Sequence, residues 1–178
     1  LELFRHVEAN ANRSTLQWAG GEPSIALVGA ASWVSPRSYR GPARFSILQK
    51  LNDLSTKISS GGSAANTIHG LSVLGGKTYY IGKVTNDAYG KLYIEDMQSC
   101  GVAFRGSRNR LGETGTCVVL VTPDSERTML THLGVSSLLG PDDIDEEIIE
   151  SAGMIYIEGY LWTGKNTRIA AEKVARIA

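Results

Sequence analysis

The sequence predicts an α/β fold built on a mostly parallel sheet, because buried-strand patterns alternate with helical patterns along the chain. Residues 25–30 form a continuous apolar run ending in a glycine and an alanine, which is typical of a strand buried on both faces. Residues 61–101 then follow a helix, strand and helix pattern, and residues 154–157 form a second apolar run. A length of 178 residues suits one domain, with or without a small appendage.

The N-terminal third of the chain gives weaker signals. Residues 1–24 are polar and mixed, and we interpret them as a poorly defined leader. Residues 31–44 are predicted to be a loop, whose three arginines are interpreted as solvated rather than as a binding patch. Phe45, Leu48 and Leu51 have the spacing of a short amphipathic helix.

A glycine-led helix is the most informative segment. Residues 60–67 read SGGSAANT and open an apolar stripe with helical period, which Gly75 and Gly76 end. Two adjacent glycines at a helix start expose backbone N–H groups and let a polar ligand come close to them. Asn66 follows about one helical turn later, so its amide can face the same ligand. The segment therefore predicts a pocket for a small molecule.

The next elements continue the α/β pattern. Residues 78–81 have the β-branched and aromatic content of a strand. Asn86 and Asp87 can cap a second helix, which Gly101 would end. We interpret residues 82–90 as a strand-to-helix turn rather than as a catalytic loop.

A β-hairpin interrupts this pattern in the second half. Residues 116–121 and 127–132 are two β-rich runs joined by a turn, and such an insertion often forms a flap over a pocket. Pro141 is then predicted to start an acidic helix, whose carboxylates are interpreted as a solvated face rather than a metal site. A last helix is predicted from about Asn166 to the end.

Glu158 directly follows the apolar run 154–157, so it is placed at the carboxyl end of a buried strand. Ligands bind at that edge of open α/β sheets, and a carboxylate there can accept hydrogen bonds from sugar hydroxyls. The alternative is an ordinary acid that ends a strand and faces water.

Composition excludes several classes of function. Eighteen basic residues balance eighteen acidic ones, so no net charge favours nucleic acid or an anionic membrane. Two cysteines form no disulfide framework, and a cytoplasmic location is expected. The histidines and cysteines lack the spacing of metal ligands. A phosphate-loop reading of residues 70–78 fails, because the lysine is one residue too far and a strand, not a helix, follows.

Several motifs together resemble the N-terminal signature of the PfkB family, the ribokinase-like carbohydrate and nucleoside kinases. They are residues 60–67, the Leu-Gly-Gly at 74–76, and residues 81–84 with Asp87 and Gly90. Residues 115–129 look like the lid hairpin of that family, and residues 157–162 look like an adenosine-kinase-like bacterial branch. The resemblance runs from about residue 25, and firmly from residue 60, to the end.

The resemblance implies a three-layer α/β/α fold, with a mostly parallel sheet and an inserted small β lid. Residues 25–178 would be the N-terminal part of the kinase domain, with lid elements around 102–135 and an incomplete C-terminal half. Family members phosphorylate a hydroxymethyl group of a sugar or nucleoside with ATP and Mg²⁺. By similarity, the substrate-binding residues would be Gly61, Gly62, Ser63, Asn66, Thr116 and Glu158. The lid often mediates homodimers in this family.

Two departures from the family pattern bear on function. Residues 30–34 lack the Asn and Asp that usually follow the first strand and hold sugar hydroxyls. The Gly-Ala-Gly-Asp motif, whose Asp takes the proton of the attacking hydroxyl, does not occur in the chain. We therefore expect the isolated chain to contain no catalytic residue and to be inactive, with most of the ATP site outside it.

Three readings follow from these departures. The chain is the substrate-and-lid portion of a kinase, a non-catalytic fragment that binds a sugar or nucleoside or dimerises, or a gene fragment without independent function. The resemblance leans toward a nucleoside, while ribose-like and fructose-like acceptors stay open.

Overall fold

The computed structural model describes residues 24–28, 58–121 and 123–178. Apart from Ser24, which begins the first strand, the leader predicted for residues 1–24 lies outside the described residues. The same holds for the arginine-containing loop, the short helix predicted over 45–51 and the divergent residues 30–34.

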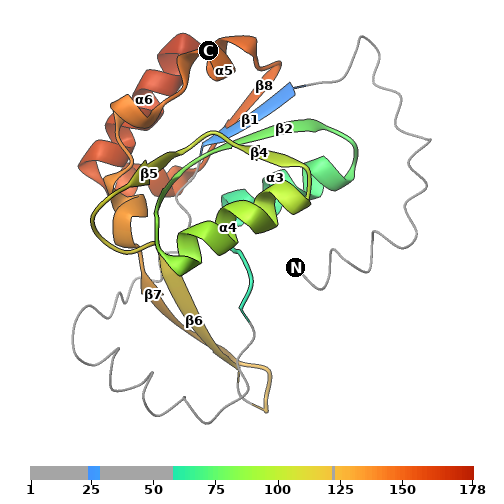
Figure 1. Cartoon of the computed structure of the whole chain (residues 1–178), viewed down its shortest axis with the longest axis vertical. Helices are drawn as coiled ribbons and strands as arrows, with labels where there is room; N and C mark the ends of the chain where they lie inside the picture. Colours follow the sequence, from blue (N-terminus) through green and yellow to red (C-terminus); the bar gives the residue numbers. More distant parts are fainter. Residues whose placement is uncertain (1–23, 29–57, 122) are drawn as a thin grey trace.

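Four parallel strands form the central sheet, in the order β4-β2-β1-β8 (Figure 1). They are β1 (Ser24–Val28), β2 (Lys77–Ile81), β4 (Val102–Phe104) and β8 (Met154–Ile157). The register of β1 aligns Ala26 with Tyr79 on one side and with Ile155 on the other. β1 therefore lies inside the sheet, although β8 is formed by residues far along the chain.

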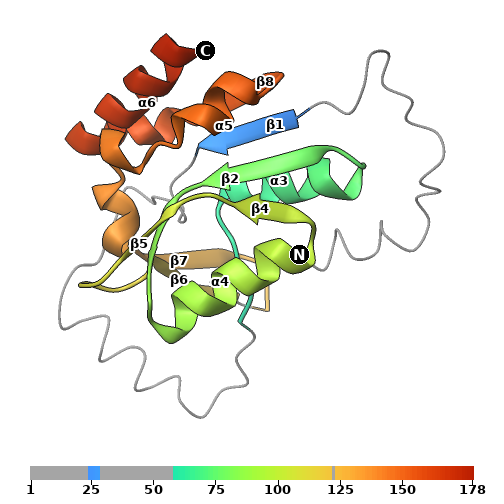
Figure 2. The ribbon, with the colours of Figure 1, turned by 45° about the horizontal axis from the view of Figure 1, so that its top comes forward.

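Helices cover both faces of this sheet and make three layers (Figure 2). On one face lie α3 (Ser63–Val73) and α4 (Ala88–Ser99), and on the other lie α5 (Glu146–Ser151) and α6 (Lys165–Ile177). Successive side chains of β2 point to opposite faces of the sheet, and so they pack against the two helical layers alternately. Tyr80 packs with α3 and α4, whereas Ile81 packs with α5 and α6.

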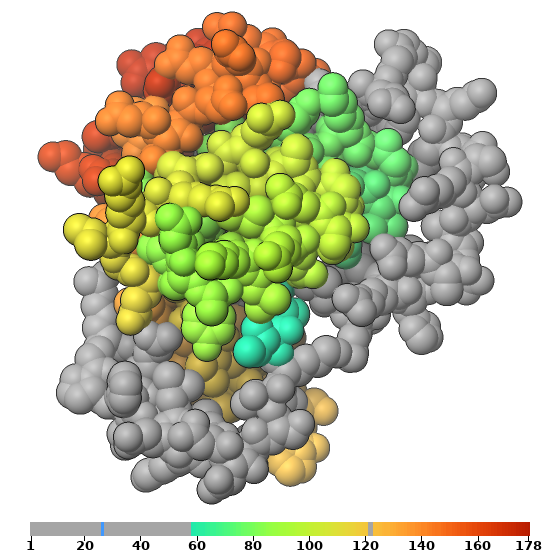
Figure 3. Space-filling view, viewed as in Figure 1, coloured from blue at the N-terminus to red at the C-terminus, as the bar shows by residue number. Residues whose placement is uncertain are grey.

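Two small pairs of strands complete the described fold. β3 (Lys83–Thr85) pairs in parallel with β5 (Ser107–Asn109), and β6 (Thr116–Val121) pairs antiparallel with β7 (Arg127–His132). The β6–β7 hairpin extends away from the layers, and the space-filling view places it below α4 (Figures 1 and 3). Of the range 102–135, β4 belongs to the central sheet, whereas β5 and the β6–β7 hairpin belong to the two small strand pairs.

Three short 3₁₀ helices connect the later elements: Gly134–Leu138, Pro141–Asp143 and Gly159–Thr163. The acidic helix predicted from Pro141 is wrong as one helix, because it breaks at Ile144. Asp145 accepts a hydrogen bond from the Ile148 N–H and so begins α5 as a separate helix. The last helix was predicted from about Asn166, and α6 confirms it.

Candidate functional site

The start of α3 is shaped by Gly62, its N-cap residue. Gly62 has φ 110° and ψ 141°, a conformation that side chains strongly disfavour. Because a glycine has no side chain, the cap residue itself cannot accept a hydrogen bond from the N–H groups of the first helical turn. A Cβ added at Gly61 would meet no atom within 4 Å, so the space beside the helix start is open. The N–H groups of this turn can therefore serve a ligand.

The carboxyl edge of the sheet brings Ser63 and Glu158 together. The hydroxyl Oγ of Ser63 donates a hydrogen bond of 2.5 Å to Oε1 of Glu158. Glu158 directly follows β8 and is the N-cap of the next 3₁₀ helix. The helix α3 starts at the same edge of the sheet, because it runs back toward the beginning of β2. Glu158 is 6% exposed, so the alternative of a strand-end acid that faces water is wrong.

The other predicted site residues, Asn66 and Thr116, lie on α3 and on the hairpin. Asn66 is exposed one turn into α3, and its N–H bonds the Gly62 carbonyl oxygen at 2.9 Å. His69, three residues after Asn66 on the same helix, is buried. Thr116 begins β6 in a separate sheet, opposite His132. The structure thus joins Ser63, which follows the two glycines, to Glu158, and it places Thr116 on the hairpin.

Aromatic side chains support this site from the α3 and α4 side of the sheet. The ring centroids of Tyr80 lie 6.0 Å from those of both Tyr93 and Phe104. Burial raises the pKa of the Tyr80 phenol well above its usual range, and the negative charge of Glu158 raises it further. Burial raises the pKa of Tyr93 in the same direction. Both tyrosines are therefore neutral, and with Phe104 they form a cluster of aromatic rings.

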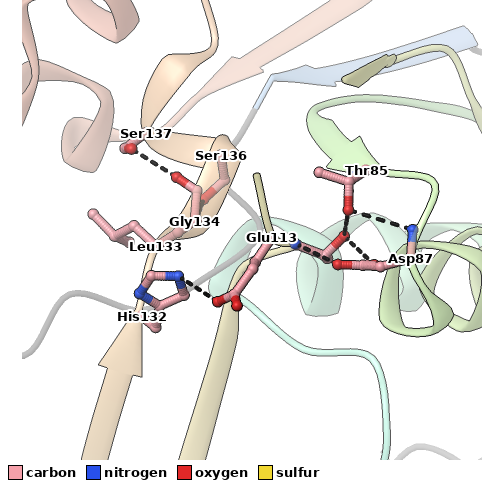
Figure 4. Close-up of polar contacts among 9 residues, drawn as sticks. Thr85, Asp87, Glu113, His132, Leu133, Gly134, Ser136 and Ser137 are labelled. Carbon is pink, nitrogen blue, oxygen red and sulfur yellow. Dashed lines mark hydrogen bonds and ion pairs between the residues drawn. The ribbon is translucent and has the colours of Figure 1, made fainter. Parts of the chain in front are cut away.

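A second polar cluster, not foreseen from the sequence, surrounds Asp87 (Figure 4). Its Oδ1 accepts hydrogen bonds from the Gly90 N–H and the Thr114 hydroxyl, both at 2.7 Å, and its Oδ2 accepts the Thr114 N–H at 2.8 Å. Thr85 donates its N–H to the Thr114 Oγ1 at 3.0 Å. Burial acts to raise the pKa of Asp87, but these hydrogen bonds outweigh it and lower that pKa from 3.8 to about 2.

The residues beside Thr114 hold the two ends of the hairpin together. Oε2 of Glu113 lies 3.2 Å from Nε2 of His132, and the Glu113 carbonyl oxygen accepts the Val135 N–H at 2.9 Å (Figure 4). Gly134 has φ 52°, and a Cβ there would lie 2.1 Å from the same carbonyl oxygen. A close backbone contact therefore fixes the base of the hairpin.

Within the described ranges, no group of three or more His, Cys, Asp or Glu side chains is arranged to hold a metal ion. Among those same residues, no helix has the length and apolar content that crossing a membrane requires.

Comparison with known proteins identifies the class to which this fold and site belong. Residues 49–178 match the model of the family described as pfkB family carbohydrate kinase. The chain belongs to this family, and the family predicted from its motifs is confirmed.

Curated relatives carry sugar-kinase names. The chain is 36% identical over 104 residues to the ATP-dependent ribose-1-phosphate kinase of Halopiger xanaduensis, covering 58% of this chain and 35% of that protein. It is 33% identical over 122 residues to the 5-dehydro-2-deoxygluconokinase of Clostridium perfringens, covering 66% and 36% respectively. The chain thus spans about a third of the length of these relatives.

A solved structure confirms the ribokinase-like fold. The adenosine kinase from Sinorhizobium meliloti superposes with a TM-score of 0.76 at 28% identity, covering 89% of this chain and 54% of that chain. The predicted α/β class with a parallel sheet is therefore correct, and the chain corresponds to about half of that neighbour.

Proposed function

We propose that this chain is the acceptor-binding and lid portion of an ATP-dependent kinase that phosphorylates a hydroxymethyl group of a sugar or nucleoside. The observation that carries the proposal is the hydrogen bond between Ser63 and Glu158, which joins a glycine-led helix start to the carboxyl edge of the sheet. Ligands bind at this edge in open α/β sheets. The family membership and the names of the relatives support the same reaction class.

Each residue of the site would have a distinct task. Gly61 and Gly62 would allow substrate hydroxyls to reach the N–H groups of the first turn of α3. A carboxylate has about four lone-pair positions, so Glu158 can accept further hydrogen bonds besides the one from Ser63. Asn66 would offer its exposed amide to the same ligand.

The β6–β7 hairpin would act as the lid. Thr116 stands at the beginning of β6, where it would cover the bound sugar. The resemblance to the family also implies a homodimer through the lid. Light scattering of the purified chain would measure that dimer.

Phosphoryl transfer itself would need groups beyond the described residues. ATP with Mg²⁺ supplies the phosphoryl group in this reaction class. The described residues offer no cluster of metal ligands, and the sequence contains no Gly-Ala-Gly-Asp motif. We therefore expect the isolated chain to bind an acceptor without phosphorylating it.

Calorimetry of the chain against ribose, fructose and adenosine tests the proposal. We expect one of these ligands to bind, and Glu158→Gln to weaken that binding about tenfold or more, because it removes a charged hydrogen-bond acceptor. Glu150→Gln, at an exposed acid of α5, is the matched control and should bind as the wild type does. Binding of none of the three ligands, or equal binding by the Glu158 variant, would contradict the proposal.

A further inference from the structure

Asp87 does more than cap a helix. As the N-cap of α4 it accepts the Gly90 N–H, which is the ordinary task of an aspartate at that position. Its two carboxylate oxygens also accept both donors of Thr114, from the segment that leads into the hairpin. One charged group therefore ties the start of α4 to a distant part of the chain.

Thr114 stands at the point from which both hairpin strands depart. Gly115 separates it from Thr116, the first residue of β6. A Cβ at Gly115 would lie 2.7 Å from the Leu133 carbonyl oxygen, next to the end of β7. The segment from Thr114 to Thr116 therefore packs closely against the backbone at the end of β7.

Thr85 completes the connection to the body of the protein. Its N–H and its hydroxyl both contact the Thr114 hydroxyl, at 3.0 Å and 3.1 Å. Thr85 is the last residue of β3, and Thr85 and Thr114 are both buried. Hydrogen bonds in such a shielded cluster are stronger than at the surface.

Asp145 shows what a capping aspartate looks like without this connection. It caps α5 by accepting the Ile148 N–H at 3.3 Å, which is a local bond within its own helix. The Asp87 cluster adds links across 27 positions of sequence to the same kind of cap. This difference points to a task beyond starting the helix.

We propose that Asp87 is a positioning residue for the lid, which it holds through Thr114 at a fixed angle to the body of the protein. The proposal rests on the proposed function in taking the β6–β7 hairpin as the lid over the acceptor. The link between Asp87 and the hairpin base is itself independent of any ligand.

The variant Asp87→Asn separates the two tasks. An asparagine whose oxygen replaces Oδ1 keeps the Gly90 cap, but its NH₂ group then faces the Thr114 N–H that Oδ2 accepted. Hydrogen–deuterium exchange of the full chain, read on peptides by mass spectrometry, reports local opening. We expect exchange to rise about tenfold in peptides covering residues 113–121 and 127–134, because a hydrogen bond to a charged group is lost. Peptides of α3 and β2 should keep wild-type rates.

Asp145→Asn is the matched control, and it should leave exchange in the hairpin unchanged. Thr114→Val removes the hydroxyl while sparing the Gly90 cap, so it should also loosen the hairpin, and Thr114→Ser should restore wild-type exchange. If Asp87→Asn does not fold, the two Thr114 variants still test whether this cluster holds the hairpin. Unchanged hairpin exchange in the variants, or an equal rise in α3 and β2, would overturn the proposal.

Calorimetry on the same proteins separates this inference from the proposed function. We expect Asp87→Asn to bind the acceptor more weakly than Asp145→Asn does. If the wild-type chain binds no ribose, fructose or adenosine, the proposed function fails while the exchange data still decide the role of Asp87.

Discussion

Gly62 is the residue on whose backbone the proposed site depends. Its φ of 110° is a conformation that a side chain makes costly, so we expect Gly62→Ala to lower the free energy of unfolding by about 1–3 kcal/mol. Gly61→Ala is the matched control, because a Cβ there meets no atom within 4 Å. Urea denaturation of the two variants measures the difference. Equal stabilities would show that the bend at Gly62 carries no strain for alanine.

Asp87 makes stability depend on pH. Its pKa is lowered from 3.8 to about 2 in the folded protein, so its contribution to the free energy of unfolding is complete above about pH 4. It is lost as the pH falls through about 2, where the folded protein takes up the proton. We expect the stability advantage of wild type over Asp87→Asn to be constant from pH 7 to 5 and to shrink from pH 4 to 2. Thermal unfolding across this range measures it, and an advantage that persists at pH 2 would contradict the lowered pKa.

The two polar clusters differ in whether their contacts could be predicted from the sequence. Glu158 and the start of α3 could be predicted to meet, because parallel strands direct their carboxyl ends to one edge and each crossover helix starts there. The contact of Asp87 with Thr114 could not be predicted. It joins a helix cap to a loop without periodicity, and only the tertiary fold determines which donor an aspartate reaches.

At the scale of elements, long segments with a clear period were predicted and short ones were missed. The helices α3, α4 and α6 carry apolar stripes, and β6 and β7 carry long β-rich runs. In contrast, β3, β4 and β5 have three residues each, too few for alternation to be visible. Their existence depends on partners that are distant in sequence, such as β5 for β3.

An ion pair attaches the β3–β5 strand pair to the 3₁₀ helix Pro141–Asp143. Nζ of Lys83 on β3 lies 2.8 Å from both carboxylate oxygens of Asp143, and their side chains are 16% and 11% exposed. Burial acts to raise the pKa of Asp143, but hydrogen bonds from the Lys83 ammonium and from the Gly140 N–H, together with the Lys83 charge, outweigh it and lower that pKa. The ion pair therefore connects β3 to the 3₁₀ helix Pro141–Asp143, and no backbone hydrogen bond of the central sheet joins these two elements.

Breaking this pair should be costly. We expect Lys83→Met to lower the free energy of unfolding by about 1.5–3 kcal/mol, because Asp143 loses its charged partner in a shielded place. Arg168→Met is the control, since the Arg168–Glu172 pair is 52% and 48% exposed and should contribute about 0.5 kcal/mol or less. Chemical denaturation of both variants measures these values. Similar losses in the two variants would mean that shielding adds nothing to the Lys83 pair.

For the whole molecule, the edge of the sheet at β8 differs from its interior. β8 pairs with β1 in the central sheet, and Met154 and Tyr156 on it are 59% and 42% exposed. The chain also covers 54% of the adenosine kinase that it resembles in structure. Apolar side chains on an edge strand invite association, so light scattering should be recorded over a range of protein concentrations in every binding experiment.

The position of β1 inside the sheet has a consequence for how the chain acquires its structure. Val28 has Ile81 as one neighbour and Ile157 as the other, so β1 gains its second partner only after the residues up to β8 have been synthesised. Contacts between such distant residues slow folding, because a long loop must close before they form. One edge of β1 therefore stays unpaired during synthesis until β8 emerges.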